Sequence, residues 1–356
     1  MPSSRSILLV LALACSAVSG SAPAADPPQI SKPRPAPSTP PDVPPLPPAH
    51  YDSTLVVGGE DVEAQKIRTR LGVEVRINGN GPYRFVVDSG ADTSVVGLRI
   101  ARALQLPLGQ PAILNSMTAR HIVDRVRIAE LTVGSSKFRD LQLPALKEMD
   151  VGGDGLIGID ALVQQRLLMD FEKRSIKVED ARIPVKAMPG DIVVTAKRKR
   201  GQLILTQVKA AGLPLEAVID TGSEVTIGNT KLRDKLIRGH RDKFWTVEAT
   251  GVTGVTVKMQ MAVIGELQLG PVTLRNVPIA FADVPPFALF GLANEPALLL
   301  GTDMLENFRR ISLDFRARKI RFQLKKCGTT GIVLSTSLTR SFSRLSSTGG
   351  IDVCGR

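Results

Sequence analysis

The sequence predicts an all-β protein made of two homologous lobes, related by a pseudo-twofold axis and carrying only short helices. Runs rich in β-branched residues alternate apolar and polar positions, as in LGVEVRI and LILTQVKA, which is the pattern of half-buried strands. Turn signals such as the stretch NGNG at 78–81 separate these runs. Several blocks of the first half recur in the second, and such a repeat indicates a fold assembled from like units.

The first residues have the features of an export signal. Arg5 precedes an apolar run at 7–14, which is followed by small residues. The run is well short of the roughly 20 apolar residues that a membrane span requires. We therefore expect a signal peptide at 1–24, cleaved after Ala24, and a periplasmic or secreted protein. In the alternative interpretation the stretch LALAC is a lipidation signal and Cys15 carries a lipid anchor.

The next segment, 25–50, is rich in proline. Residues 23–48 hold twelve of the 25 prolines, a composition that favours extended polyproline II and does not build a core. We predict a spacer that separates the folded body from a membrane or cell wall; an inert leader is the alternative. At the other end, 327–356 is predicted to be a Ser/Thr-rich tail.

The folded body is predicted to divide into lobes at 51–190 and 191–326. YRFVVDSGADTSVVG (83–97) recurs as LEAVIDTGSEVTIGN (215–229). Further repeated blocks are 129–143 with 265–279, 156–162 with 299–305, and 169–178 with 313–322. The offset drifts by a few residues from block to block, which indicates loop insertions between equivalent strands. Short helices are expected at 96–104 and 230–237, each after one copy of an Asp-Ser/Thr-Gly triplet.

That triplet is the strongest chemical signal of the sequence. Asp88 and Asp220 each follow an apolar strand, and a buried carboxylate is costly unless it is hydrogen-bonded. We expect the neighbouring hydroxyl and the glycine N–H to satisfy it. A pseudo-twofold axis would bring the two carboxyls together, where they would share a proton, so that one acts as base and the other as acid.

These motifs resemble the pepsin and retropepsin aspartic peptidases. Asp88-Ser89-Gly90 and Asp220-Thr221-Gly222 match the catalytic loops of that family, and the triplets that end in Gly158 and Gly301 match its ψ-loops. Over about 65–325 the resemblance implies a bilobed pepsin-like acid protease fold, made of two fused retropepsin-like units. It also implies that Asp88 and Asp220 are catalytic and that Ser89, Gly90, Ser94, Thr221, Gly222 and Thr226 support the catalytic loops.

The chain departs from the family pattern at three places. Ile159 and Thr302 follow the ψ-loop glycines, where retroviral enzymes usually have arginine or another polar residue, so the ion pair that braces a retroviral dimer is not expected. The segment 113–123 lacks the flap tyrosine of pepsin, and Ser89 replaces the commoner threonine. By position in the repeat, 115–120 is the predicted flap, with Met117 covering an apolar substrate side chain, and 251–256 is predicted to form a shorter hairpin in lobe two.

Taken together, these features predict an aspartic endopeptidase of the bacterial envelope. Water activated between the two aspartates would hydrolyse a peptide bond, and a monomer without a cofactor would suffice. The alternative is a peptide- or ligand-binding module that kept the fold without turnover. Turnover of a denatured-protein library by the purified secreted form would separate the two.

The remaining motifs give weaker predictions. The three histidines, His50, His121 and His240, have no partners at metal-ligand spacing, so no metal site is expected. The run KRKR (197–200) lacks interleaved aromatic residues and is interpreted as a solvated connector, and nucleic-acid binding is not expected. If Cys15 is removed or lipidated, Cys327 and Cys354 are expected to form a disulfide in an oxidising compartment.

Overall fold

The structure is a computed structural model of the whole chain. It describes residues 29–37, 44–46, 61–67, 70–134, 136–162, 165–185, 190–236 and 244–325, except the side chains of 61–67. Several predictions fall outside these residues: the signal peptide with Cys15, the tail with the Cys327–Cys354 disulfide, and any role of His50 or His240.

Lobe one is a closed six-stranded β-barrel. Hydrogen-bonded neighbours run in the order β4, β3, β8, β9, β5, β10 and back to β4. In the turn between β3 and β4, Asn78 and Gly79 both have positive φ, as a tight two-residue hairpin turn requires. The strands are β3 (Arg70–Ile77), β4 (Asn80–Val87), β5 (Val95–Gly97), β8 (Arg125–Val133), β9 (Ser136–Leu146) and β10 (Gly155–Ile157).

Lobe two repeats this barrel strand for strand. Its neighbours run in the order β15, β14, β18, β19, β16, β20 and back to β15. Each repeated sequence block therefore forms the equivalent element in both lobes, which confirms the predicted duplication. The strands are β14 (Gln202–Ala210), β15 (Leu213–Ile219), β16 (Ile227–Gly228), β18 (Thr256–Leu269), β19 (Val272–Phe281) and β20 (Ala297–Leu300).

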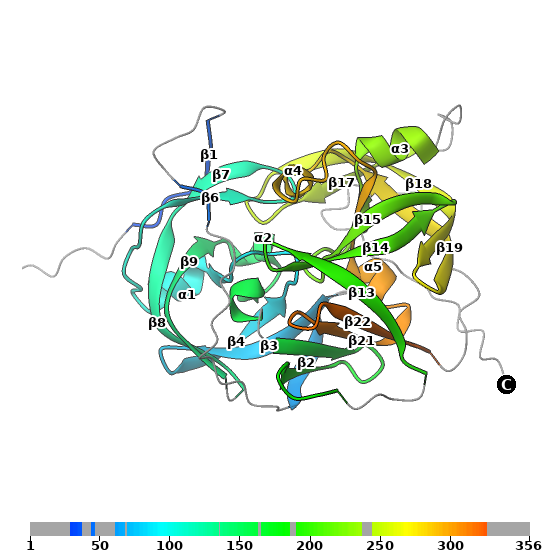
Figure 1. Cartoon of the computed structure of the whole chain (residues 1–356). Helices are drawn as coiled ribbons and strands as arrows, with labels where there is room; N and C mark the ends of the chain where they lie inside the picture. Colours follow the sequence, from blue (N-terminus) through cyan, green and yellow to red (C-terminus); the bar gives the residue numbers. More distant parts are fainter. Residues whose placement is uncertain are drawn as a thin grey trace, which may run out of the picture.

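A six-stranded sheet joins the two barrels (Figure 1). Its order is β2, β12, β11, β21, β22, β13, and β11 and β21 pair antiparallel at the centre, with Met169 opposite Ile311. Both residues are buried, so this pair of strands is part of one core that spans the lobes. The strands are β2 (Asp61–Ile67), β11 (Gln165–Asp170), β12 (Ser175–Asp180), β13 (Ile192–Lys199), β21 (Phe308–Asp314) and β22 (Lys319–Leu324).

The helices are short, and the predicted all-β, bilobed fold class is confirmed. Helices α1 (Leu98–Ala103) and α3 (Thr230–Leu236) lie within the two predicted segments. The others are α2 (Glu148–Val151), α4 (Pro285–Leu289), α5 (Thr302–Leu305) and a 3-10 turn at Ile159–Ala161. Within the described part of the chain, the helices are too short or too polar to cross a bilayer.

Two hairpins project over the space between the lobes. In lobe one, β6 (Ala112–Asn115) and β7 (Arg120–Val123) flank the predicted flap turn, and in lobe two β17 (Trp245–Thr250) pairs with the start of β18. The prediction of a shorter hairpin in lobe two is wrong, because β17 pairs along six residues and β6 along four. The reason is that β18 runs unbroken from hairpin to barrel, whereas Asp124 interrupts β7 and β8.

Part of the proline-rich segment, which was predicted to be a spacer, lies against lobe one. Strand β1 (Arg34–Pro35) pairs with β7, and Pro45 forms a parallel bridge with Ile113 of β6 (Figure 1). Extended proline-containing backbone still offers carbonyl oxygens and the N–H groups of its other residues, and proline is tolerated at a sheet edge. The composition that suggested a free spacer is therefore also compatible with edge strands.

Candidate active site

The two aspartates of the repeated triplet end equivalent strands. Asp88 follows β4 and Asp220 follows β15, and each backbone N–H donates to a carbonyl of the neighbouring parallel strand: Asp88 to Ile157 of β10 (2.9 Å) and Asp220 to Leu300 of β20 (3.0 Å). The ψ-loop strands thus hold the ends of the aspartate-bearing strands in the same way in both lobes.

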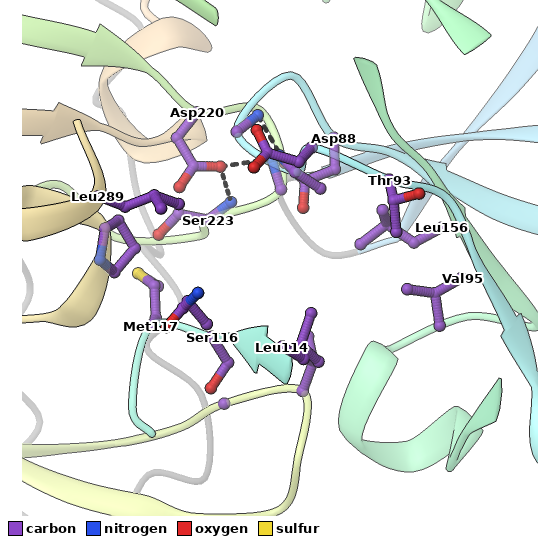
Figure 2. A pocket seen from close by; sticks show the side chains of 18 of the residues that line it. Asp88, Thr93, Val95, Leu114, Ser116, Met117, Leu156, Asp220, Ser223 and Leu289 are labelled. Atoms are coloured by element: carbon purple, nitrogen blue, oxygen red, sulfur yellow. Dashed lines mark hydrogen bonds between the residues drawn. The ribbon is translucent and has the colours of Figure 1, made fainter. Parts of the chain in front are cut away.

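The two carboxyl groups meet at the pseudo-twofold axis and hydrogen-bond to each other (Figure 2). Each also accepts two backbone N–H donors from its own loop. Asp88 Oδ1 accepts from Gly90 (2.8 Å) and Ala91 (3.0 Å). Asp220 Oδ1 accepts from Gly222 and Ser223, both at 3.0 Å. These backbone donors fix both carboxyls side by side.

Each loop glycine makes room for the aspartate of the opposite lobe. A Cβ added to Gly90 would lie 2.6 Å from Asp220 Cγ, and one added to Gly222 would lie 2.1 Å from Asp88 Cγ. Real Cβ atoms do not approach another heavy atom so closely. The glycine of the triplet is therefore required by the close approach of the two lobes.

The hydroxyls of the triplets lock the two loops together. Ser89 Oγ donates to the carbonyl of Ile219 (3.0 Å), and Thr221 Oγ1 donates to that of Val87 (2.9 Å). The backbone N–H of Ser89 donates to Thr221 Oγ1 (2.9 Å), and that of Thr221 donates to Ser89 Oγ (3.2 Å). The expectation that these hydroxyls satisfy the neighbouring carboxylates is wrong. They form a buried crossed network between lobes instead.

A second layer lies beneath each loop. Ser94 Oγ accepts the N–H of Gly158, and Thr226 Oγ1 accepts that of Gly301, both at 3.0 Å. A Cβ on either ψ-loop glycine would strike backbone at 2.6 Å, on Thr93 and Val225 respectively. The predicted supporting residues therefore connect each ψ-loop to the catalytic loop beside it.

Two partly buried carboxyls complete this layer, and the sequence analysis did not identify them. Asp160 accepts the hydroxyl (2.7 Å) and the N–H (2.9 Å) of Ser94. Asp303 accepts the same groups of Thr226, at 2.7 and 3.0 Å. Burial raises the pKa of both carboxyls, that of Asp303 to about 7. The repeated blocks LIGIDAL and LLGTDML contain both, two residues after the ψ-loop glycine, and that spacing was the available signal.

Arg70 and Gln202 make a further pair of contacts between the lobes, which the sequence did not predict. Buried Arg70 donates to the carbonyl of Gly222 (3.4 Å) and lies 3.3 Å from Glu224 Oε1. In the equivalent place of lobe two, Gln202 donates to the carbonyl of Gly90 (3.4 Å) and to Asp92 (2.6 Å). The hydrogen bonds of Arg70 and Gln202 to the two loop carbonyls are thus symmetric, but only Arg70 carries a charge.

The surroundings of Asp88 and Asp220, here called the dyad, raise the pKa values of the two carboxyls to different extents. Burial raises the pKa of Asp88, against the lowering effects of the Gly90 N–H and of the Arg70 guanidinium. The pKa of Asp220 is raised further, first by burial and then by the negative charge of Asp88. One carboxyl therefore keeps a proton under conditions where the other is ionised.

A cleft of about 190 Å³ opens from the dyad toward the flap hairpins. In Figure 2 the aspartates face Leu114, Ser116 and Met117 across the cavity. Apolar side chains form the two side walls: Val95 and Leu156 from lobe one, and Leu289 with its neighbours from lobe two. Met117, in the turn between β6 and β7, lines the cleft and packs against the lobe-two wall.

Among the described residues, no group of three His, Cys, Asp or Glu side chains is placed to hold a metal ion. His121, the one histidine that the structure describes, is buried in β7 of the flap hairpin.

Comparison with known proteins supports the assignment of the two lobes. The family model described as aspartyl protease matches the chain twice, at 73–161 and at 206–304. These two regions contain the two Asp-Ser/Thr-Gly triplets and the two ψ-loop glycines. No curated protein sequence matches the chain significantly.

Proposed function

The chain belongs to the aspartyl protease family, and we propose that it is an endopeptidase that hydrolyses peptide bonds with water activated between Asp88 and Asp220. The observation that carries the proposal is the pair of facing carboxyls, each fixed by two N–H donors of its own loop. Two such groups supply both a base and an acid, so the proposed reaction needs no cofactor.

The charges around the dyad suggest how the roles divide. Arg70 favours the ionised form of Asp88, and the negative charge of Asp88 favours the protonated form of Asp220. Asp88 then removes a proton from water as the oxygen attacks the peptide carbonyl, and Asp220 donates its proton to the carbonyl oxygen. When the gem-diol intermediate collapses, one of its hydroxyls returns a proton to Asp220 as the C=O bond re-forms, the C–N bond breaks, and Asp88 gives its proton to the leaving amine.

The shape of the cleft favours an extended peptide with apolar side chains on both sides of the cleaved bond. Hairpin edges such as β6 offer backbone hydrogen bonds to an added strand. Val95 and Leu156 form one apolar wall, and Leu289 lies in the other. A charged side chain would lose its hydration at either wall, so apolar residues are the preferred occupants.

We further propose that the protein acts as an exported monomer of the bacterial envelope. One chain supplies both aspartates, so no second copy is needed to assemble the site. Export rests on the signal-like residues 1–24. Specific activity should remain constant on dilution, and the mature N-terminus of protein recovered from cells should show whether 1–24 is removed or Cys15 is lipidated.

Turnover of a denatured protein library by the purified chain is the direct test. Products identified by mass spectrometry should show internal cleavage between apolar residues. Asp88→Asn and Asp220→Asn should each abolish cleavage, whereas Asp150→Asn, the same change elsewhere in the cleft, should not. If the parent protein binds peptides without cutting them under any pH condition, it is the binding module that the sequence left as the alternative.

A further inference from the structure

The chain's own N-terminal segment lies in the proposed substrate cleft. Leu46 is only 7% exposed and lines the same cavity as Asp88 and Asp220. Its neighbours Pro44 and Pro45 are exposed. The Leu46 side chain is thus buried in the site, while the two residues before it remain exposed.

Backbone hydrogen bonds hold this part of the segment on strand β6. Leu46 N–H donates to the carbonyl of Ile113 (3.0 Å), and Ile113 N–H donates to the carbonyl of Pro44 (2.8 Å). Both backbone groups of Ile113 are therefore occupied. A substrate strand that pairs with this edge of the flap must first break both bonds.

Residues 34–37, earlier in the same segment, pair with the other edge of the hairpin, strand β7. In β1, Arg34 lies opposite Ile122 of β7, and Ala36 N–H donates to the carbonyl of Arg120 (3.1 Å). The Arg120 guanidinium donates in turn to the carbonyl of Pro37 (2.8 Å). Ile30, further back, is buried in the main core, which anchors the segment to the body.

From these contacts we propose that residues 44–46 are a resident ligand of the cleft, and that the site they fill recognises an extended segment through one leucine-sized apolar side chain. The proposal rests on the proposed function in one respect, that the same cleft receives the substrate. Substrate binding, release of residues 44–46 and movement of the flap are then one coupled equilibrium. An attached segment competes at an effective concentration in the millimolar range.

A binding experiment in full-length protein tests this without turnover. Leu46→Asp should expel the segment, because a carboxylate in the apolar cleft loses its hydration. Pro45→Asp adds the same charge at an exposed neighbouring position and is the matched control. Both changes are made in an Asp220→Asn background, so that no peptide is cut during the measurement.

The probe is a fluorescent peptide that copies residues 41–49, PDVPPLPPA. It should bind the Leu46→Asp protein at least ~10-fold more tightly than it binds the Pro45→Asp protein, whose own leucine competes for the site. The peptide PDVPPDPPA should not bind either. Equal affinity in the two proteins, or failure of the Leu46→Asp protein to bind PDVPPLPPA, overturns the proposal.

Hydrogen exchange gives a second measurement that requires neither activity nor peptide. The amides of Leu46, Ile113 and Ala36 should exchange slowly in the parent chain, and the amide of Ile113 should exchange faster in Leu46→Asp and unchanged in Pro45→Asp. An Ile113 amide that exchanges at the same rate in all three proteins contradicts the docking. Because neither assay measures hydrolysis, a chain without peptidase activity would still give a clear result.

Discussion

Arg70 of lobe one and Gln202 of lobe two hold the same position in the duplicated fold, and only Arg70 is charged. Each is in the first strand of its barrel and donates to the carbonyl of the opposite lobe's loop glycine, at 3.4 Å in both cases. On the Gln202 side, Arg200 pairs with Asp92 at 2.9 Å, and the Arg200 side chain is 26% exposed. A fused chain can thus make a symmetric site electrostatically unequal, which a dimer of identical subunits cannot.

Replacing Arg70 with glutamine should shift the acidic limit of the pH–rate profile to higher pH. Arg70 lowers the pKa of Asp88, so its removal raises that pKa, and activity that needs ionised Asp88 is lost sooner as the pH falls. The profile of kcat/KM against pH is the measurement. Arg70→Lys keeps the charge and should retain most of the parental limit; an unchanged profile in Arg70→Gln would mean that the residue serves only the packing of the loops.

The two aspartates should behave as one unit in kinetics. Asp88→Asn or Asp220→Asn should each lower kcat by orders of magnitude, and the double replacement should lower it little further, because the second carboxyl has no function once the first is gone. The parental pH profile should be bell-shaped, with limits that belong to the pair. A double mutant whose loss equals the product of the single losses would show that the carboxyls act independently.

The crossed hydroxyls should contribute measurably to stability. Ser89→Ala or Thr221→Ala leaves buried backbone groups unpaired between the lobes, at a cost of about 1–3 kcal/mol in the free energy of unfolding. Thr221→Ser keeps the hydroxyl and should remain within a fraction of that cost. Urea unfolding followed by circular dichroism measures the differences, and equal stability of Thr221→Ala and Thr221→Ser would show that the network contributes nothing.

Stability should fall as the pH rises toward neutrality. Burial raises the pKa of Asp303 to about 7 from an ordinary value of 3.8. A carboxyl whose pKa is higher in the folded state stabilises the fold fully below 3.8, and this contribution is lost as the pH rises through about 7. Asp160 and the dyad, whose pKa values are also raised, act in the same direction.

The free energy of unfolding at pH 4 and pH 7.5 should therefore differ less in Asp303→Asn than in the parent, because the amide does not titrate. Asp140→Asn changes an exposed aspartate and should keep the parental difference. An Asp303→Asn protein with the full parental difference would exclude this carboxyl as a source of the pH dependence.

The flap residue Met117 should affect substrate binding more than folding. It is half-buried against the apolar wall of lobe two, so a carboxylate there would oppose an apolar substrate side chain. Met117→Asp should raise KM for apolar-centred peptides by about tenfold, whereas Met117→Leu, which conserves volume, should change it little. Equal KM values in the two variants would place the covering residue elsewhere in the hairpin.

The sequence predicted those features of the site that are present in both copies of the repeat. Asp88 and Asp220, the loop glycines and the ψ-loop glycines follow the ends of strands whose alternation and turn signals are local, so the sequence alone predicts each of them. The crossing contacts could not, because the direction of a hydroxyl such as that of Ser89 depends on the other lobe. Arg70 and Gln202 are different residue types, so the repeat did not reveal their equivalence.

The docking of Leu46 was missed for a related reason. Proline-rich composition describes the local backbone and predicts an extended segment correctly, but it does not say which edge that segment meets. Strand addition at β6 and β7 depends on long-range pairing, which no local pattern encodes. The error in hairpin length likewise arose because only the structure shows that β18 is continuous.

The crossed hydrogen bonds of Ser89 and Thr221 also determine at what stage of folding the two aspartates come together. Each barrel closes within its own lobe, whereas the hydrogen bonds between Ser89 and Thr221 and the carbonyls of Ile219 and Val87 join residues at least 130 positions apart. Contacts between such distant residues form late, since the intervening chain must be ordered first. A nascent or half-folded chain therefore holds two separate carboxyls, and the facing pair that the proposed hydrolysis requires forms only when both lobes are complete.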